Sequence, residues 1–323
     1  MKYIYTPGGT VDGCWTYNFG NFLNKLINEE SNEVCLFYGL HTLDRSDLDE
    51  LLKKNEKNFF LEFNAGLTLI FDNIDKKIIQ LKKFDVVLCG EKLLVEFLKN
   101  FGINAFFINK VPLPLDSGRF QFKKYQEKDI DIIYSGGIYS KEIFNSIKII
   151  SYFNYKYTYY SKNNVFPRFT FNPFYFFSFK KERVSPDKLI HYLSRSKAGF
   201  IFCKAYLKPI EMKIIARFKD KFSKDTYEKI IKSKEIPDYK GRLAELSAMK
   251  NVMLVHEDSW KLIEDYYQPN KQFLYFKTSK ELNDLIVDIS RNYHKYIYLA
   301  ENAYKDIQNY TIKDFYNKII KYK

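Results

Sequence analysis

The chain has 323 residues, of which 46% are hydrophobic, and it carries a formal net charge of +13. This length and composition predict two domains with substantial cores, and they argue against a disordered chain. No segment reaches the roughly 18 uncharged apolar residues that a membrane-spanning helix needs, and the apolar run at the N-terminus is too short for a signal peptide. The positive charge favours anionic partners, although a lysine-rich solvated surface would account for it equally well.

The four cysteines are far apart in the sequence, and no two of them form a C-x-x-C pair. This spacing argues against a structural zinc site and is typical of a reducing compartment. No compact run of arginine and lysine interleaved with aromatic residues indicates a nucleic-acid module. We therefore expect a cytoplasmic protein that binds neither nucleic acid nor a metal ion.

Strand-like and helix-like segments alternate over the first part of the chain. Apolar strands are expected at 2–5, 33–38, 58–63, 85–89 and 105–108, with helices at 17–28, 46–54, 74–82 and 91–100. Such alternation predicts a parallel α/β sheet. We assign residues 1–116 to an N-terminal Rossmann-like domain, and the stretch 117–128, which follows a run with two prolines, to a linker.

The same alternation starts again in the second part of the chain. Strands are expected at 130–134, 156–160, 198–203, 252–255 and 273–276, with helices at 142–150, 185–195 and 279–291. We assign residues 129–305 to a C-terminal domain, interrupted by a basic and mostly helical insertion at about 204–238. The last segment, 306–323, is expected to be a helix that can pack back on the N-terminal domain.

The stretch 240–255 carries the strongest functional signal in the chain. Gly241 and Arg242 open a short helix, Glu245 lies one turn further on, and an apolar strand follows. Free N–H groups and the helix dipole at such a start favour a diphosphate. A carboxylate one turn later can accept hydrogen bonds from ribose hydroxyls.

A second turn suited to phosphate follows the strand at 130–134. It consists of Ser135, Gly136 and Gly137. Glycines at the carboxyl end of a strand let the backbone approach a phosphate closely, and the following helix adds further N–H donors. A plain strand-to-helix turn is the alternative, but the order of the two motifs along the chain favours the phosphate site.

The order and spacing of these motifs resemble the donor-binding domain of two-domain (GT-B) glycosyltransferases of the group 1 type. The resemblance runs from Leu193 through Arg242 and Glu245 to the helix near 300–301, whereas the N-terminal part matches only as a Rossmann-like pattern. The chain departs from the family in two places. Lys250 stands where the family usually has glycine, and Pro237 stands where the retaining branch has its first glutamate, so the stereochemical outcome is left open.

The resemblance implies an α/β fold with two Rossmann-like domains that face each other across a cleft. It also implies a glycosyltransferase that moves a sugar from a nucleotide-sugar to an acceptor hydroxyl, in the synthesis of a bacterial surface polysaccharide or glycoconjugate. Such enzymes need neither a metal nor a cofactor, because the helix dipole and basic residues neutralise the leaving diphosphate. Donor contacts are expected from Ser135, Gly136, Gly137, Lys204, Gly241, Arg242 and Glu245.

The acceptor is expected to enter through the N-terminal domain. Gly8 and Gly9 lie in the loop after the first strand, which faces the cleft in the resembling enzymes. Asp12 in that loop, and Glu62 at the end of the strand at 58–63, are the candidate general bases. Glu91 and His41 are alternatives, and each of these residues could instead be an ordinary turn, cap or loop residue.

Two other functions remain open at this point. One is another transferase on the same fold, acting on a pyruvyl or phosphosugar group, and the other is a non-catalytic nucleotide-sugar-binding or scaffold protein. The basic insertion adds a separate question. It could contact anionic lipid or a lipid-linked acceptor at the inner face of the cell membrane, or it could be a solvated insertion that packs one face on its own domain.

Overall fold

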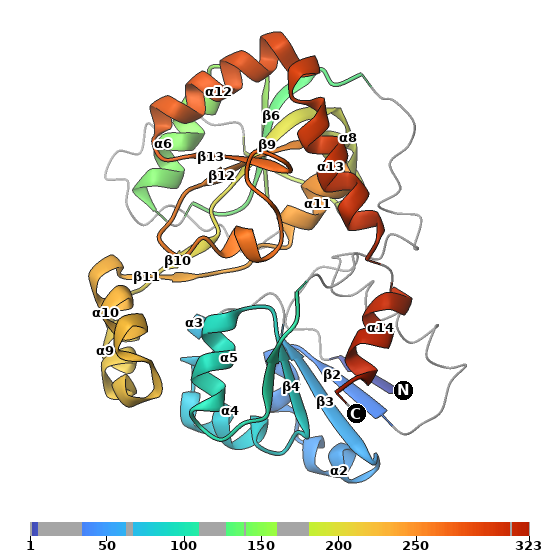
Figure 1. The fold of residues 1–323 in the computed structure, drawn as a ribbon, viewed down its shortest axis with the longest axis vertical. Coiled ribbons are helices and arrows are strands. Elements are labelled where there is room, and N and C mark those ends of the chain that lie inside the picture. The colour runs from blue at the N-terminus through green and yellow to red at the C-terminus, as the bar shows by residue number, and fades with distance from the viewer. Residues whose placement is uncertain are drawn as a thin grey trace. The chain divides into compact units, whose positions relative to one another are not determined.

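The computed structural model describes residues 2–5, 34–62, 67–109, 127–138, 140–159, 181–310 and 312–322. The chain divides into two compact units, each of which contains a parallel sheet (Figure 1). Unit 1 consists of Met1–Pro114, Lys204–Tyr239 and Tyr310–Lys323, and unit 2 of Leu115–Cys203 and Lys240–Asn309. Segments far apart in the sequence thus build each unit together.

Unit 1 contains a five-stranded parallel sheet whose strands lie side by side in chain order. The strands β3 and β4 are buried apart from Lys57 at the start of β3, and Phe59, Phe60 and Leu88 are fully inaccessible, as expected when helices cover a parallel sheet. The strands are β1 (Lys2–Tyr5), β2 (Val34–Tyr38), β3 (Lys57–Glu62), β4 (Val86–Cys89) and β5 (Ala105–Phe107). The helices between them are η1 (Leu40–Asp44), α2 (Leu48–Lys53), α3 (Leu67–Ile70), α4 (Ile74–Leu81) and α5 (Lys92–Lys99).

The insertion and the C-terminal helix complete unit 1. An antiparallel ribbon of β10 (Lys204–Tyr206) and β11 (Glu235–Pro237) carries α9 (Pro209–Arg217), η3 (Lys219–Lys221) and α10 (Lys224–Ser233). The ring of Phe222 packs on that of Phe97 in α5, with the centroids 5.0 Å apart. In α14 (Ile312–Ile320), Lys318 donates a hydrogen bond to the side chain of Asn109. The insertion therefore lies with unit 1, whereas the sequence-based division had placed it in the C-terminal domain.

Unit 2 contains a six-stranded parallel sheet in the order β13-β12-β9-β6-β7-β8. The strands are β6 (Ile130–Ser135), β7 (Tyr155–Tyr159), β8 (Lys181–Arg183), β9 (Ser196–Ile201), β12 (Val252–His256) and β13 (Phe273–Phe276). Counted from β6, this is the 3-2-1-4-5-6 order of the doubly wound Rossmann fold. The helices are α6 (Lys141–Ile150), α8 (Pro186–Arg195), α11 (Arg242–Ala248), α12 (Ser279–Asn292) and α13 (Ile297–Gln308), with η4 (Leu262–Asp265) and η5 (Tyr293–Lys295) as single 3-10 turns.

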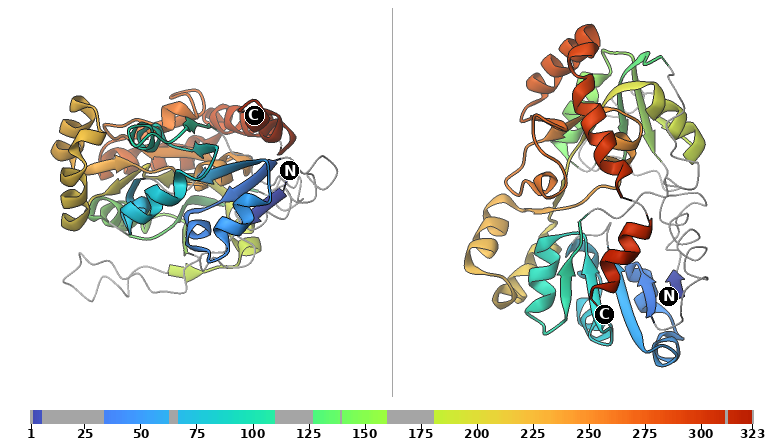
Figure 2. Two further views of the ribbon diagram at one scale, coloured as in Figure 1. Left: turned by 90° about the horizontal axis from the view of Figure 1, so that it is seen from below. Right: turned by 45° about the vertical axis from the view of Figure 1, so that its right-hand side comes forward.

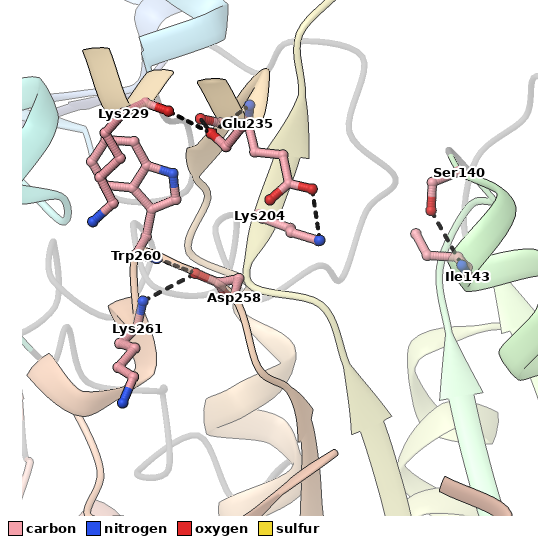
Figure 3. Close-up of polar contacts among 9 residues, drawn as sticks. Ser140, Ile143, Lys204, Lys229, Glu235, Asp258, Trp260 and Lys261 are labelled. Carbon is pink, nitrogen blue, oxygen red and sulfur yellow. Dashed lines mark hydrogen bonds and ion pairs between the residues drawn. The ribbon is translucent and has the colours of Figure 1, made fainter. Parts of the chain in front are cut away.

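Serine caps start two of these helices. The hydroxyl of Ser140 accepts a hydrogen bond from the backbone N–H of Ile143 at the start of α6 (Figure 3). Ser185, followed by Pro186, caps α8. Ser46, the first residue of the helix expected at 46–54, is not its cap, because α2 begins at Leu48 and Asp47 stands in the cap position. The Asp47 carboxylate is bound to Arg45 instead of capping the helix.

Helix α11 is held closely against strand β9. A Cβ atom on Gly199 in β9 would lie 2.5 Å from Cδ2 of Leu246, so glycine leaves the room that this helix occupies. At the end of α11, Lys250 takes a left-handed conformation with φ of 51°, and the N–H of Asn251 bonds the carbonyl of Leu246. Lys250 thus closes the helix in the conformation that usually requires glycine, and its ammonium bonds Glu301, 2.8 Å away.

Lys128 ties the end of α11 to the start of β9. Its ammonium donates hydrogen bonds of 2.8 Å to the carbonyl of Ser196 and to that of Met249. Burial, together with the nearby charge of Lys250, lowers the pKa of Lys128 to about 7. The hydrogen bonds hold the helix in place, but the charge that strengthens them is costly to bury.

The lowered pKa of Lys128 predicts a pH-dependent stability. In the unfolded chain lysine titrates near ~10.4, so between about pH 7 and pH 10 the unfolded state binds more protons than the folded state. We expect the free energy of unfolding to rise from about pH 7 to about pH 9, by up to about 1.4 kcal/mol per pH unit, and to be lost again as the pH falls towards 7. Urea unfolding at a series of pH values measures this free energy. Lys128→Met should remove this slope, and an equal slope in both proteins would contradict the assignment.

Candidate functional site

The strand order places the candidate site at the carboxyl end of β6. In unit 2 the chain leaves β6 towards β7 on one side and later returns to β9 on the other, so the order reverses between β6 and β9. Ligands of open α/β sheets bind outside the carboxyl ends of the strands at such a reversal. Among the described strands of unit 1 the order runs in one direction only. The predicted turn, Ser135 with Gly136 and Gly137, lies directly at the reversal in unit 2.

The predicted helix start reaches this turn. A Cβ atom on Gly136 would lie 2.7 Å from Nη1 of Arg242 and 3.1 Å from the hydroxyl of Tyr134. The Arg242 guanidinium therefore occupies the space that only glycine leaves free. Two motifs separated by about a hundred residues in the sequence thus meet at one point.

Three buried polar atoms surround this point without a hydrogen-bond partner among the described residues. They are Oγ of Ser135, Oγ1 of Thr158 and Nε of Arg242. Ser135 and Thr158 are paired in register on β6 and β7, and the N–H of Gly136 donates to the Thr158 carbonyl over 2.9 Å. Because buried polar atoms are nearly always hydrogen-bonded, these atoms are suited to receive a polar, anionic group.

Glu245 adds a buried carboxyl group to the same helix. Only 6% of the residue is exposed, and it lies one turn after Arg242, with its N–H bonded to the carbonyl of Gly241. Burial raises the pKa of Glu245, while the charge of Arg242 acts in the opposite direction. Such a group can accept hydrogen bonds from hydroxyls when ionised and can also donate one when protonated.

Tyr134 supports the turn through its hydroxyl and its ring. Its hydroxyl donates a hydrogen bond of 2.7 Å to the carbonyl of Gly137, and its ring stacks on Phe200 with the centroids 4.5 Å apart. Sequence reasoning missed both Tyr134 and Thr158. Tyr134 directly precedes the recognised turn, but the part played by Thr158 depends on the register between β6 and β7, which the sequence does not show.

Lys204, the remaining predicted donor contact among the described residues, lies in the β10–β11 ribbon of unit 1. Its Nζ is 2.7 Å from a carboxylate oxygen of Glu235, and the two side chains are 5% and 14% exposed (Figure 3). The ammonium also lies 4.9 Å from the centroid of the Tyr206 ring. Lys204 thus belongs to a buried ion pair in the ribbon. Gly8, Gly9 and Asp12 lie outside the described residues.

Two acids lie at the carboxyl ends of neighbouring strands in unit 1. Oε2 of Glu62, at the end of β3, accepts a hydrogen bond of 3.0 Å from the N–H of Leu40, and Oε1 of Glu91 accepts one of 2.8 Å from the N–H of Tyr239. Both residues are at most 5% exposed. Burial first, and these two carboxylates next, raise the pKa of the Cys89 thiol between them. His41 lies in η1, and its side chain is outside the described part.

The described ranges contain no group of three or more His, Cys, Asp or Glu side chains placed to hold a metal ion. None of their helices is both long enough and apolar enough to cross a membrane.

No protein-family model matches this chain. No curated protein matches its sequence either. Solved structures do match it, and those reported below have the GT-B fold of glycosyltransferases. The likeness shows that this chain has the same fold, so the predicted fold class is confirmed.

Three of these structures have similar scores. A variant of TarM from S. aureus, in complex with UDP and other ligands, has a TM-score of 0.54 at 11% identity over 94% of this chain. HepE from Anabaena, in complex with UDP and glucose, has a TM-score of 0.54 at 9% identity over 94% of this chain and 81% of its own. Sucrose-phosphate synthase from Thermosynechococcus elongatus has a TM-score of 0.53 at 9% identity over 95% of this chain and 78% of its own. The chain spans 58% of the length of TarM.

The contact between Gly136 and Arg242 can be tested without any ligand. We expect Gly136→Ala to lower the free energy of unfolding by about 1 to 2 kcal/mol, because the added methyl group displaces the guanidinium and the Tyr134 hydroxyl. In an Arg242→Ala background the same substitution should cost clearly less, since one of the two obstacles is gone. Urea unfolding of the four proteins measures this coupling, and strictly additive effects would show that the two residues do not meet.

Proposed function

We propose that this chain is a glycosyltransferase that transfers a sugar from a nucleotide-sugar to an acceptor hydroxyl, without a metal ion. The observation that carries the proposal is the convergence of Gly136, Arg242 and the unpartnered hydroxyls of Ser135 and Thr158 at the strand-order reversal of unit 2. The complexes of HepE with UDP and with UDP-glucose support a uridine nucleotide as the first donor to test.

In this proposal the leaving diphosphate is held by unit 2. The amide of Gly137 and the hydroxyls of Ser135 and Thr158 donate hydrogen bonds to its oxygens, whereas the N–H of Gly136 is engaged by the Thr158 carbonyl. Arg242 provides the positive charge that stabilises the diphosphate as the glycosidic bond breaks, which is where a metal ion would otherwise act. Arginine suits this position because its planar guanidinium can bond two oxygens at once.

Glu245 is proposed to hold the ribose of the donor. It is buried one turn after Arg242, on the same helix, so both can contact one nucleotide. A buried carboxyl group bonded to two adjacent hydroxyls discriminates strongly against a sugar that lacks them, because the group would be left unpaired. Lys250 stands where the resembling family usually has glycine, and it closes α11 in a left-handed conformation. We propose that the helix therefore keeps the position that nucleotide binding requires.

The first test is the affinity for UDP. Arg242→Ala should weaken UDP binding by about tenfold to a hundredfold, the effect of losing charge-assisted hydrogen bonds. Arg195→Ala is the matched control, because Arg195 lies in unit 2 but is ion-paired with Asp129. Isothermal titration calorimetry measures both variants. If Arg242→Ala binds UDP as tightly as the control, the donor site is not where we place it.

Unit 1 is proposed to supply the general base that deprotonates the acceptor, with Asp12 and Glu62 as the candidates. Glu62 is suited to a test, because glutamine can still accept the hydrogen bond from the N–H of Leu40. If Glu62 is the base, Glu62→Gln should lower kcat by about a hundredfold or more while leaving UDP affinity and thermal stability unchanged. Sugar transfer is measured with the donor found in a screen. Unchanged kcat would remove Glu62 and leave Asp12 as the candidate.

The proposed setting is the cytoplasm, in the synthesis of a bacterial surface polysaccharide or glycoconjugate. The alternatives, a transferase of pyruvyl or phosphosugar groups and a non-catalytic nucleotide-sugar-binding protein, predict different results in one donor panel. A glycosyltransferase slowly hydrolyses its own nucleotide-sugar in the absence of acceptor, and thermal shift identifies the nucleotide. Binding without any hydrolysis or transfer would favour the non-catalytic protein.

A further inference from the structure

The start of α9 and the end of α10 lie side by side at one end of the insertion (Figures 1 and 2). The N–H of Leu207 donates a hydrogen bond of 2.9 Å to the carbonyl of Lys234. Tyr206 and Glu235 are paired immediately before and after these residues in the β10–β11 ribbon. The exposed side chains at the start of α9 and at the end of α10 therefore belong to neighbouring parts of the surface.

That surface combines isoleucine with lysine. Ile210 is 60% exposed and Ile231 is 36% exposed, although both are large aliphatic residues. The apolar packing of the insertion does not use them, because Ile215 and Ile230 are fully buried on the inner face. Four exposed lysines complete the surface, which we call the lysine–isoleucine patch: Lys208, Ile210, Lys213, Ile231, Lys232 and Lys234.

The neighbouring acids offset only one lysine of the patch. The Glu211 carboxylate accepts a hydrogen bond of 2.6 Å from the N–H of Lys208 and lies 3.7 Å from the Lys208 ammonium, so Lys213, Lys232 and Lys234 carry the charge of the patch. Glu235 is bound to Lys204 inside the ribbon. Glu228, one turn before Lys232 on α10, lies 4.0 Å from the ammonium of Lys224. The charge that the patch presents to an approaching partner is therefore positive.

We infer that the lysine–isoleucine patch docks on the surface of a membrane that contains anionic lipid. Lysines near such a surface are attracted to the lipid headgroups, and each adds a modest gain that salt weakens. Aliphatic side chains on the same surface enter the boundary between headgroups and acyl chains, as in peripheral amphipathic helices. Exposed isoleucine has no matching role on a phosphate backbone of nucleic acid, which is bound by charge and hydrogen bonds.

This inference goes beyond the proposed function and does not depend on it. The sequence pattern alone does not show which part of the insertion would contact lipid. In the structure the apolar face is divided: Phe222 packs on Phe97 of α5, whereas Ile210 and Ile231 are exposed at the end next to the β10–β11 ribbon. The contact with lipid is thereby assigned to one end of α9 and α10.

The experiment is sedimentation of the full chain with vesicles of phosphatidylcholine, with and without phosphatidylglycerol. The charge variant is Lys213→Glu with Lys232→Glu and Lys234→Glu. Its control reverses three exposed lysines elsewhere: Lys53→Glu, Lys280→Glu and Lys305→Glu. The apolar variant is Ile210→Ser with Ile231→Ser. Its control is Ile79→Ser with Ile297→Ser, whose 60% and 39% exposure matches that of the patch isoleucines.

We expect the wild type to bind only the vesicles that contain phosphatidylglycerol. The charge variant should lose about a hundredfold in affinity and the apolar variant roughly tenfold, while both controls bind like the wild type. Thermal unfolding checks that the four variants fold, and UDP titration checks their donor site. We expect neither measurement to differ from the wild type. The inference fails if the wild type does not bind, if it binds neutral vesicles equally well, or if the control variants lose as much affinity as the patch variants.

Discussion

The candidate site depends on the missing side chain at Gly136. A single methyl group there would overlap the guanidinium of Arg242, 2.7 Å away, so the arginine reaches the end of β6 only because the residue is glycine. The approach brings the start of α11 to the turn that contains Ser135, and Glu245 follows on the same helix. The hydroxyls of Ser135 and Thr158, which are buried without a hydrogen-bond partner among the described residues, belong to this turn and to the neighbouring strand.

Several separate contacts hold α11 in the position that this approach requires. Gly199 leaves room for Leu246, so the helix packs close to β9. The Lys128 ammonium bonds the carbonyl of Met249, directly after the helix, and that of Ser196, the first residue of β9. Lys250 closes the helix with a positive φ and an ion pair to Glu301. A helix of 7 residues has little stability of its own, so its position is set by these tertiary contacts.

The insertion illustrates how one amphipathic segment can serve two purposes. Its inner residues pack on α5, and its ribbon contains the buried pair of Lys204 and Glu235. A buried ion pair of this kind contributes little net stability, but losing one partner is costly. Lys204 is therefore a structural residue of the ribbon. Lys213, Lys232 and Lys234 stay exposed on the same insertion, where we propose the contact with lipid.

Much of the fold could be predicted from local patterns. The strand at 273–276 has the predicted bounds, and most other strands and helices differ by one or two residues, because apolar runs bounded by turn residues report local structure directly. β8 and the β10–β11 ribbon were not predicted, because these three-residue strands contain charged residues and no apolar run, unlike the equally short β5. The helix expected at 46–54 begins two residues later, at Leu48, and the pair of Arg45 and Asp47 before it is a side-chain contact that the sequence pattern does not show.

By itself, the sequence determined the alternation of strands and helices, the glycine turn after β6 and the arginine and glutamate that open α11. Only the tertiary structure decided that these two motifs meet, that Thr158 joins them, and that Lys204 is paired within unit 1. The physical reason is that strand order and register arise from contacts between residues far apart in the chain. Local propensity and periodicity carry no record of such contacts.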